Sequence, residues 1–499
     1  MAVKINFNEA AAQTHTALIQ NERAMNKSLL RLSTGMRILN AADDSAGLFI
    51  ADMLGTVAKA YDQGNRNIQT GISALQIAEA SAGQIYNKLQ EIYVRAQNAA
   101  NDINDPVARQ ALQQEIRNFV DAIQKIGTDT EYNGIKLLDG TFKDKYIHYG
   151  PRMEQTVYVS ISDIRAQSVG AHMLVTAGSA ASASGGFTSL TNYVSTSSVT
   201  ALIGGRVIDA TIQNGSGSSS KYIFDAGHVA EQVNTGLSDV GFVAKAVNVS
   251  RGNPYTAIAN VNDTATLTFY VGNKSFSITA ATTVTLDDLV NRINEAAGTN
   301  GADLSASVDA GRLVLTSSKG YTIGVEVQLS NTSATNATIN LDQLIQSVSS
   351  QTGTQASAVK VGQLYVANDR EFTQSGINTT QFGGYVVGSA SNSEFKNLYG
   401  IDVTKNQGAE IAMLTSQIAL RTVDKIRAQI GATMNNLQSI FDSQKVAYDN
   451  TKEAESVIRN TDYAKEMAEF TTYQIRMQAT VAMLGQANTL PQLVLQLLR

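Results

Sequence analysis

Residues 68–99, IQTGISALQIAEASAGQIYNKLQEIYVRAQNA, decide the fold of the helical part of this chain. Their apolar side chains recur at steps of three or four, which is the period of one face of an α-helix. The residues on this face are Ile68, Ile72, Leu75, Ala78, Ala82, Ile85, Leu89, Ile92 and Ala96. Because such a face is stable only when another element covers it, the stretch predicts helix-on-helix packing.

The same spacing occurs near both ends of the chain, over residues 18–39, 105–127 and 423–484. Asp105–Pro106 predicts a capped helix start with Pro at the first helical position. The residues that we expect to pack helices together are Leu29, Leu32, Met36, Leu39, Ile72, Leu75, Leu89, Ile116, Phe119, Ile123, Ile430, Met434, Leu437, Phe441, Met477, Val481, Leu484, Leu493, Leu495 and Leu498. The helices could pair within one chain or between chains, and the periodicity favours neither.

The middle of the chain, from about residue 140 to 395, is rich in Ser, Thr, Val and Gly and predicts strands. Residues 264–270 and 275–279 flank Gly272–Asn273, which indicates a hairpin. Residues 312–316 and 321–327 flank a second turn that contains Gly320, and residues 286–296 predict a short helix between the two pairs. A weaker echo of this pattern over residues 223–247 suggests two copies of one β-rich module.

Composition excludes several classes of protein. The 499 residues carry a net charge of −5, which argues against a nucleic-acid binder held by phosphate contacts. There is no Cys, so disulfides, thiolate metal sites and cysteine nucleophiles are excluded. No run approaches the ~18 apolar residues of a membrane span, and the first twenty residues lack the apolar core of a signal peptide, so we expect neither membrane insertion nor a cleaved leader.

The residues that usually carry chemistry are scattered. His15, His148, His172 and His228 have no metal-ligand spacing, and the His228–Glu231 pair lacks the second His of a zinc motif. The carboxylate pair Asp43–Asp44 is better explained as a capping turn than as an acid–base site. We therefore expect no enzyme, no metal and no cofactor.

Ordered motifs at both ends resemble the bacterial flagellin family. Residues 32–47, LSTGMRILNAADDSAG, are similar to its amino-terminal signature, and residues 65–73 and 131–140 are similar to its next two blocks. Residues 430–432, 460–464 and 485–495 are similar to its carboxy-terminal signature. Residues 262–328 also resemble the small insertion module of flagellins and hook-associated proteins.

The resemblance implies a multi-domain fold, with an all-α bundle or coiled-coil core formed by both termini and a β-rich (α+β) variable middle region that projects outward. Residues 1–45 with 455–499 would form the terminal helical domain of the filament's inner tube. Residues 46–170 with 397–454 would form a helical core domain with a β-hairpin, and residues 171–396 the variable outer region with its insertion module at about 262–328.

The resemblance also implies an extracellular structural subunit that self-assembles into the flagellar filament for swimming. Its partners would be other flagellin subunits, the hook-associated junction and cap proteins, the flagellar type III export apparatus and a cytosolic export chaperone on the C-terminal tail. The alternatives are a hook–filament junction protein or, less well supported, a filament-displayed enzyme or adhesin. An enzyme of the metalloprotease kind would need a His–Glu–x–x–His motif, which the sequence lacks.

One set of residues departs from the family pattern. Many members carry a patch on the second long helix that Toll-like receptor 5 recognises. When the sequence is aligned on Leu89–Gln90 and Asn101, Glu91 stands where those members have Arg, and Arg95 stands where they have Leu, whereas Glu115 matches. Because a charge reversal and a charge in place of an apolar anchor both weaken an interface, we expect weak receptor activation.

Overall fold

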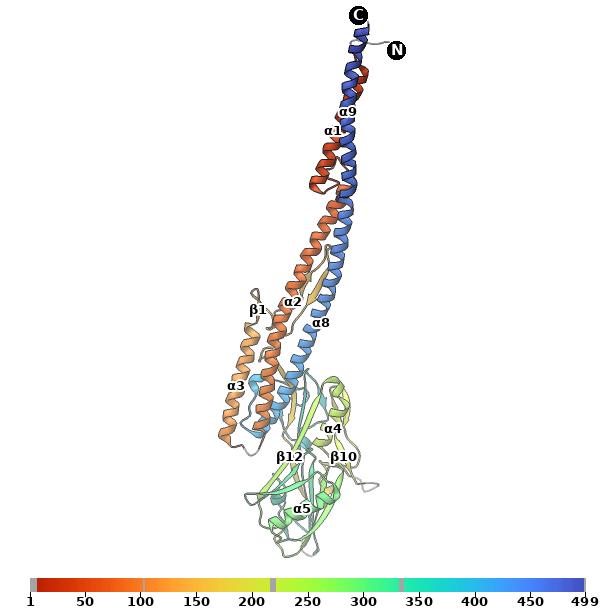
Figure 1. Ribbon diagram of the computed structural model, residues 1–499. Coiled ribbons are helices and arrows are strands. Elements are labelled where there is room, and N and C mark those ends of the chain that lie inside the picture. Colours follow the sequence, from red (N-terminus) through yellow and green to blue (C-terminus); the bar gives the residue numbers. More distant parts are fainter. Residues whose placement is uncertain (1–6, 102–103, 216–220, 332–335, 498–499) are drawn as a thin grey trace. The chain divides into compact units, whose positions relative to one another are not determined.

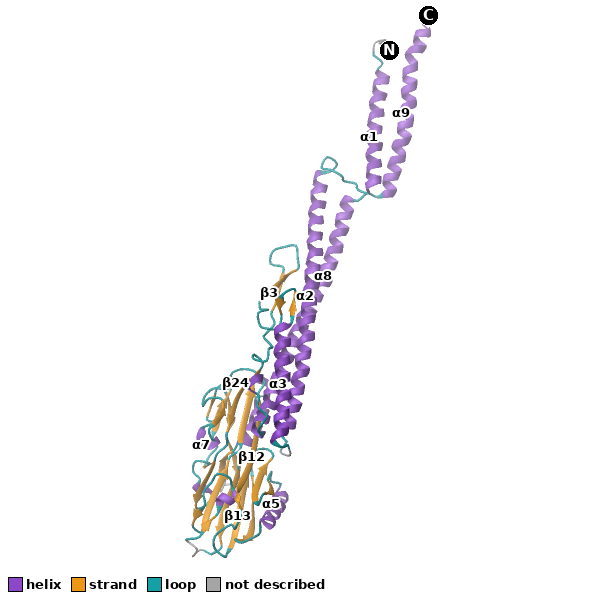
Figure 2. Cartoon of the chain, turned by 90° about the vertical axis from the view of Figure 1, so that its left-hand side faces the viewer, coloured by secondary structure: helices purple, strands orange, loops and turns teal. Residues whose placement is uncertain are grey.

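The computed structural model describes residues 7–101, 104–215, 221–331 and 336–497, with only the main chain described over 490–497. Long helices form both ends of the chain and strands form its middle (Figures 1 and 2). The long helices are α1 (Glu9–Thr34), α2 (Ser45–Ala99), α3 (Pro106–Asp129), α8 (Asn406–Arg459) and α9 (Tyr463–Leu497). This confirms the expected fold class of a helical core with a β-rich middle region.

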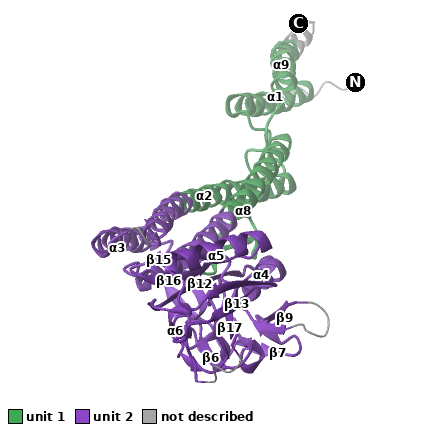
Figure 3. Cartoon of the chain, turned by 90° about the horizontal axis from the view of Figure 1, so that it is seen from below, with its two compact units in different colours: residues 1–76, 143–160, 431–499 green, residues 77–142, 161–430 purple. Residues whose placement is uncertain are grey.

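The chain divides into two compact units, each built from segments that are distant in sequence (Figure 3). Unit 1 contains residues 1–76, 143–160 and 431–499, and unit 2 contains residues 77–142 and 161–430. These limits differ from the domain limits expected from the sequence, because the β-rich residues 171–396 share a unit with helical residues 77–142 and 397–430. The physical reason lies in a sheet face that α8 covers, described below.

In unit 1, α1 and α9 pair in antiparallel orientation. The Asn21 side chain donates to Thr480 Oγ1 at 2.9 Å. Closer to the end of α1, Ser28 Oγ donates to the Glu466 carbonyl at 3.3 Å. Helix α1 ends at Thr34, where Gly35 takes the left-handed conformation that terminates many helices.

The expectation that one helical stripe runs on to residue 39 is therefore wrong. Met36 and Leu39 lie in the connection between α1 and α2, where Met36 forms a β-bridge with Asn460. The cause is Gly35, whose left-handed backbone stops the helix before the apolar spacing stops.

A hairpin of β3 (Lys145–His148) and β4 (Thr156–Val159) lies against α2 within unit 1. Two helix glycines make the close approach possible. A Cβ at Gly64 would lie 1.8 Å from the Tyr149 carbonyl oxygen, and one at Gly71 would lie 2.3 Å from Ile147 Cδ1. Any larger residue at these positions would push the hairpin off the helix, which explains why a long helix tolerates two poor helix formers.

In unit 2, α3 begins as the sequence predicts. Asp105 Oδ1 accepts a hydrogen bond from the Ala108 main-chain N–H at 2.6 Å, and Pro106 occupies the first turn. A tight turn at Asn133–Gly134 then joins β1 (Glu131–Tyr132) to β2 (Ile135–Lys136), with positive φ angles of 51° and 77° at its two central residues.

Two larger sheets form the β-rich part of unit 2. The first has the order β15-β16-β12-β21-β5-β23, and β24 also pairs with β5. Its strands are β15 (Ser305–Asp309), β16 (Arg312–Ser317), β12 (Val243–Pro254), β21 (Gln363–Asn368), β5 (Gly170–Thr176), β23 (Tyr385–Val387) and β24 (Glu394–Asn397). The second is β14 (Lys274–Ala281), β13 (Thr264–Val271), β17 (Ile323–Leu329), β20 (Gln355–Lys360) and β6 (Ala180–Ser184).

Short strands and helices complete the unit. Two three-stranded sheets have the orders β10-β11-β7 and β22-β8-β9, and β18 pairs with β19. Their strands are β10 (Thr211–Asn214), β11 (Lys221–Phe224), β7 (Val194–Ser195), β22 (Gln374–Ser375), β8 (Thr200–Ile203), β9 (Arg206–Asp209), β18 (Thr338–Ile339) and β19 (Gln351–Thr352). The helices among them are α4 (Ala226–Gly236), α5 (Leu286–Asn300), α6 (Leu341–Leu344) and α7 (Thr379–Phe382).

One face of the first sheet packs directly on α8. Met173 and Val175 of β5, with Tyr365 and Ala367 of β21, form a buried apolar cluster with Ile411, Leu414 and Ile418. Thr415 of α8 also donates to Met173 Sδ at 3.4 Å. The sheet and the helix are therefore joined by a side-chain core as well as by the main chain.

The hairpin predicted around Gly272–Asn273 is confirmed, since β13 and β14 pair along eight residues each with those two residues as the loop. The strands predicted on either side of Gly320 exist as β16 and β17, but they lie in different sheets. Gly320 has a positive φ of 74°, and a Cβ there would clash with the Ala246 main chain, so the turn crosses closely over β12.

The predicted module echo has structural support. Each copy is a strand, a helix and a further strand: β11, α4 and β12 in the first, β14, α5 and β15 in the second. Side-chain caps from Asp225 and Thr285 start the two helices, and these residues stand sixty positions apart, as do the buried pairs Val229 and Leu289, and Val233 and Ile293.

The cap of the first module predicts a pH dependence of stability. Complete burial raises the pKa of Asp225 to about 7, although main-chain N–H groups of His228 and Thr322 act to lower it. Since the ordinary value is 3.8, the folded chain holds this proton more tightly than the unfolded chain does. This contribution to stability is complete below that value and is lost as the pH rises towards 7.

Between about pH 4 and 7, Asp225 should make the free energy of unfolding fall by roughly 1.4 kcal/mol per pH unit. We expect the Asp225→Asn variant to lack this pH dependence. Urea unfolding of the monomer at several pH values checks this, with exposed Asp287→Asn as the matched control. A pH profile unchanged by Asp225→Asn would contradict the assignment.

Candidate assembly surfaces

The predicted helical stripes fall into two groups, and the first is used inside one chain. Leu75, Leu89, Ile116, Ile123, Ile430 and Leu437 are all buried. Leu32, Leu39, Ile72, Phe119, Met434, Phe441, Met477 and Leu484 are partly buried. The buried group contributes to the cores of the two units, so these six residues pack helices within one chain.

The second group is exposed in the single chain. Leu29 on α1 and Val481 on α9 expose about half of their surface, at 50% and 53%, and Met36 is also exposed. Leu493 and Leu495 lie in α9 where only the main chain is described, and Leu498 lies outside the described residues.

Sequence periodicity missed further exposed apolar residues in unit 1. Phe49, Ile50 and Met53 line the start of α2, and Phe49 is 69% exposed. Val457 near the end of α8 and Tyr463, Ile475 and Met483 on α9 are exposed as well. These residues lie outside the regular stripe. They could have been found in the sequence as the apolar residues that remain once the stripe has been assigned. Large exposed side chains at this density mark an interaction surface.

A charged clamp joins α2 and α8 within unit 2. The Arg427 guanidinium donates to Glu79 Oε1 at 2.7 and 3.1 Å and lies over the Tyr86 ring, 5.6 Å from its centre. A Cβ at Gly83 of α2 would stand 3.8 Å from Arg427 Nη2, which is an ordinary van der Waals contact. The clamp is half-buried and orients two helices; it offers no reactive group.

A buried polar clamp ties α3 to the chain segment that leads into α8. The Gln113 side chain donates to the Ile401 carbonyl at 2.9 Å and accepts from the Val403 main-chain N–H at 2.7 Å. Both main-chain groups would otherwise be left without partners beside buried side chains. Gln113 is thus the residue that holds the returning chain on the helical core.

The residues of the altered receptor patch interact with one another. Arg95 of α2 bonds through Nε to Glu115 of α3 at 2.5 Å, and its Nη2 lies 3.7 Å from Glu91. The structure therefore brings together all three predicted positions. Glu115, which matches the family pattern, is therefore already paired with Arg95, which departs from it.

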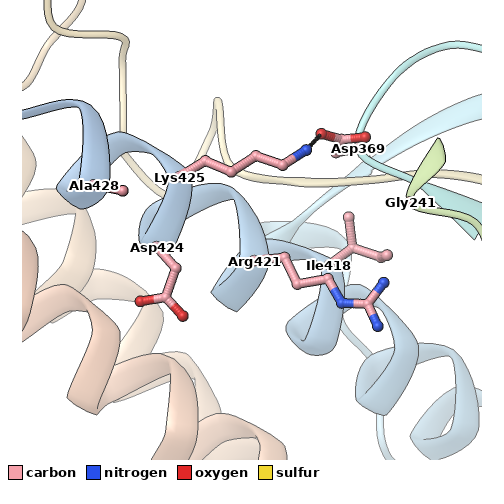
Figure 4. Close-up of a pocket in the computed structure, with 7 residues that line it drawn as sticks. All are labelled: Gly241, Asp369, Ile418, Arg421, Asp424, Lys425 and Ala428. Atoms are coloured by element: carbon pink, nitrogen blue, oxygen red, sulfur yellow. Dashed lines mark hydrogen bonds and ion pairs between the residues drawn. The ribbon is translucent and has the colours of Figure 1, made fainter. Parts of the chain in front are cut away.

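A shallow cavity of about 380 Å³ lies beside α8 (Figure 4). It is lined by Gly241, Asp369, Ile418, Arg421, Asp424, Lys425 and Ala428. The Lys425 ammonium pairs with Asp369, whereas the drawn Arg421 guanidinium points away from both carboxylates. The cavity holds an ion pair between Lys425 and Asp369, and its lining includes no Ser, Thr, Tyr or His.

The residues tested for chemistry take structural roles. Asp43 accepts from the main-chain N–H groups of Leu39 and Asn40 and pairs with Lys27 at 2.6 Å, which lowers its pKa, the Lys27 bond being the largest cause. Asp44 Oδ1 accepts from the Gly47 N–H at 2.9 Å at the start of α2. The capping interpretation of this pair is confirmed.

The four histidines stand apart from one another in function. His15 and His148 are exposed, the His172 ring lies tilted against the Phe395 ring with 5.0 Å between their centres, and burial lowers the pKa of His228. Within the described ranges, no three His, Asp or Glu residues lie close enough to hold a metal ion. No helix among the described residues is both long and apolar enough to cross a membrane.

Paired terminal helices with exposed apolar faces, and a β-rich middle, define a structural protein that associates with further chains. The comparisons agree with this class. Residues 5–143 match the bacterial flagellin N-terminal helical region, residues 413–498 the C-terminal helical region, and residues 266–319 the flagellin hook IN motif.

Full-length relatives make the family plain. A flagellin of Aquifex pyrophilus is 50% identical and a flagellin of Aquifex aeolicus is 48% identical, and each alignment covers all of both chains. A solved structure of FliC from Burkholderia pseudomallei is 16% identical, covering 74% of this chain and 99% of that one, with a TM-score of 0.29.

The chain belongs to the bacterial flagellin family. It is a structural subunit of the flagellar filament that self-assembles with copies of itself, and it is not an enzyme. A hook–filament junction protein has no better support, since the full-length relatives at about half identity are flagellins.

The polar clamp of unit 2 gives a mutational prediction. Gln113→Leu leaves the Ile401 carbonyl and the Val403 N–H without partners, and each such group costs roughly 1–3 kcal/mol. We expect the free energy of unfolding to fall by about 2–4 kcal/mol in urea, followed by circular dichroism. Gln114→Leu, on the exposed neighbouring position, should change it little, and equal effects of the two variants would refute the role given to Gln113.

Proposed function

We propose that the exposed apolar side chains of unit 1 are the contacts between subunits in the filament. The observation that carries this proposal is the exposure of Phe49, Met53, Ile475 and Met483 in a chain whose family assembles into a homopolymer. Burying such residues contributes about 25 cal/mol per Å² of apolar surface. The proposal includes the exposed predicted residues Leu29, Met36 and Val481. It also includes Leu493, Leu495 and Leu498 on sequence grounds alone.

The proposal includes a layer for each part of the chain. Residues 1–45 with 455–499 form the inner tube, residues 46–170 with 397–454 form the surrounding helical layer, and residues 171–396 form the outer region. The support is chemical, since the terminal residues expose apolar side chains that need cover, whereas the middle region closes its own cores.

We further propose secretion through the flagellar type III export apparatus without a cleavable signal peptide. A cytosolic export chaperone covers the apolar C-terminal tail before secretion, and hook-associated junction and cap proteins contact the two ends of the finished filament. The low Pro content, four in 499 residues, supports rapid refolding after passage as an unfolded chain, because few slow X–Pro isomerisations are needed.

A single charged substitution tests whether α2 takes part in the contact between subunits. Phe49→Asp places a carboxylate at a residue that is already 69% exposed, so the monomer should keep its helical content. We expect it to lose elongation from filament seeds, as seen by electron microscopy, because a charge buried in a subunit contact is strongly unfavourable.

Gln69→Asp is the matched control, since it introduces the same charge at an exposed polar position of the same helix. The control should still form filaments. Filaments of normal length from Phe49→Asp would exclude this face of α2 from the contact.

We also propose that the altered receptor patch makes this protein a weak activator of Toll-like receptor 5. Arg95 pairs with Glu115 and stands in place of an apolar anchor, and the Glu91 carboxylate would repel an acidic group of a partner. We expect purified monomer to activate receptor-bearing reporter cells weakly and Glu91→Arg with Arg95→Leu to raise the response. A strong response to the unaltered monomer, or no gain in the double variant, would count against the proposal.

A further inference from the structure

The two modules of the β-rich region share one unusual interaction. In the first module, Asn234 of α4 donates through Nδ2 to the Ala244 carbonyl at 2.7 Å, and its Oδ1 accepts from the Ala244 N–H at 2.8 Å. In the second module, Asn294 of α5 donates to the Ala306 carbonyl at 2.8 Å and accepts from the Ala306 N–H at 2.7 Å. The two asparagines stand sixty positions apart, in register with the repeat of the helices.

Each asparagine replaces a neighbouring strand. Ala306 belongs to β15, the edge strand of its sheet, whose other side pairs with β16. In an antiparallel pair, residues alternately direct both main-chain groups towards the partner strand or away from it. The N–H and C=O of Ala306 point away from β16, and the side-chain amide of Asn294 supplies the donor and the acceptor that a further strand would supply.

The same geometry holds in the first module. Ala244 lies in the first half of β12, which pairs with β21 over residues 243–247, whereas β16 pairs only with the later part of the strand. The side of Ala244 that faces away from β21 is occupied by Asn234. One residue type thus occupies the unpaired side of two strands in the same way.

These bonds are partly buried, since Ala244 and Ala306 are buried whereas both asparagines are exposed. Because the asparagines face solvent, their removal lets water approach the main-chain groups of the two alanines. Each hydrogen bond of this kind contributes only about 1 kcal/mol to the free energy of unfolding. Occupying the edge has the larger consequence, since open edge strands pair readily with other chains and β15 carries no charge between Ser305 and Val308.

We propose that Asn294 and Asn234 are edge plugs, which keep β15 and the first half of β12 from pairing with the same strand of a second copy. The chain associates by its helices in the filament, where many copies of the β-rich region stand at high local concentration. Plugged edges restrict association to the helical surfaces. This inference is independent of the subunit contacts proposed above, because it concerns only the β-rich modules.

The absence of Cys allows a direct test in the full-length monomer. If two copies of β15 pair in antiparallel register about residue 307, Ser307 of each copy faces the other as a close, non-hydrogen-bonded pair. Ser307→Cys then reports edge pairing as a disulfide-linked dimer on a non-reducing gel. Ser307 is exposed and takes no part in the plug.

We expect Ser307→Cys alone to oxidise slowly, and Ser307→Cys with Asn294→Ala to form the dimer about tenfold faster. Two other substitutions, each combined with Ser307→Cys, serve as controls. Asn291→Ala removes an exposed asparagine one turn earlier on α5, and Asn234→Ala removes the equivalent two bonds from the other module. Neither should speed dimerisation through residue 307.

Equal rates with Asn294→Ala and Asn291→Ala would overturn the proposal, and equal rates with Asn294→Ala and Asn234→Ala would show general destabilisation instead. If Asn294→Ala does not give a folded monomer, Asn294→Asp tests the same point. A carboxylate can accept from the Ala306 N–H but cannot donate to its carbonyl, so its rate should be intermediate. A rate equal to that of Ser307→Cys alone would then refute the plug.

Discussion

The structure depends on covering apolar helix faces. A helix with one apolar stripe closes that stripe against a second helix, and α2, α3 and α8 do so inside unit 2, where Leu89, Ile116 and Ile430 are fully or almost fully buried. The terminal helices carry more apolar surface than one partner can cover. Phe49, Ile475 and Met483 remain exposed after α1 and α9 have paired. In the assembly that we propose, further copies close the apolar surface that folding leaves open.

Polar residues determine which helix meets which segment. Gln113 holds residues 401 and 403 through their main chain, and Arg427 of α8 pairs with Glu79 of α2. These contacts are specific where apolar stripes are not, since many registers bury leucine equally well. The same logic recurs in the β-rich modules, where asparagine side chains close strand edges. Polar contacts thus select one arrangement among those that hydrophobic burial permits.

Much of the fold could be predicted from the sequence, because periodicity and turn chemistry are local signals. The helix start at Asp105, the hairpin at Gly272–Asn273 and the repeated modules are all confirmed. The end of α1 was not predicted, since the apolar spacing continues past the point where Gly35 adopts a left-handed backbone. The packing of a sheet face on α8 was also not predicted, because sequence gives no sign of which helix a sheet face will contact.

The assembly surface was harder to predict for a related reason. Apolar residues of one stripe look alike in sequence, yet Leu89 is buried within the chain and Leu29 is half exposed. The difference depends on how many neighbours each helix acquires in three dimensions. Phe49 and Met53 show the converse, since they stand outside the regular stripe and remain uncovered. Only the folded chain separates residues used in its own core from those left for a neighbour.

The packing of a sheet face on α8 has a mechanical consequence. Met173, Val175, Tyr365 and Ala367 bear on Ile411, Leu414 and Ile418 over a broad contact, so the β-rich region is not suspended from its two connecting strands. A force applied to that region would therefore reach about two turns of the helix through packed side chains as well as through the connecting peptides.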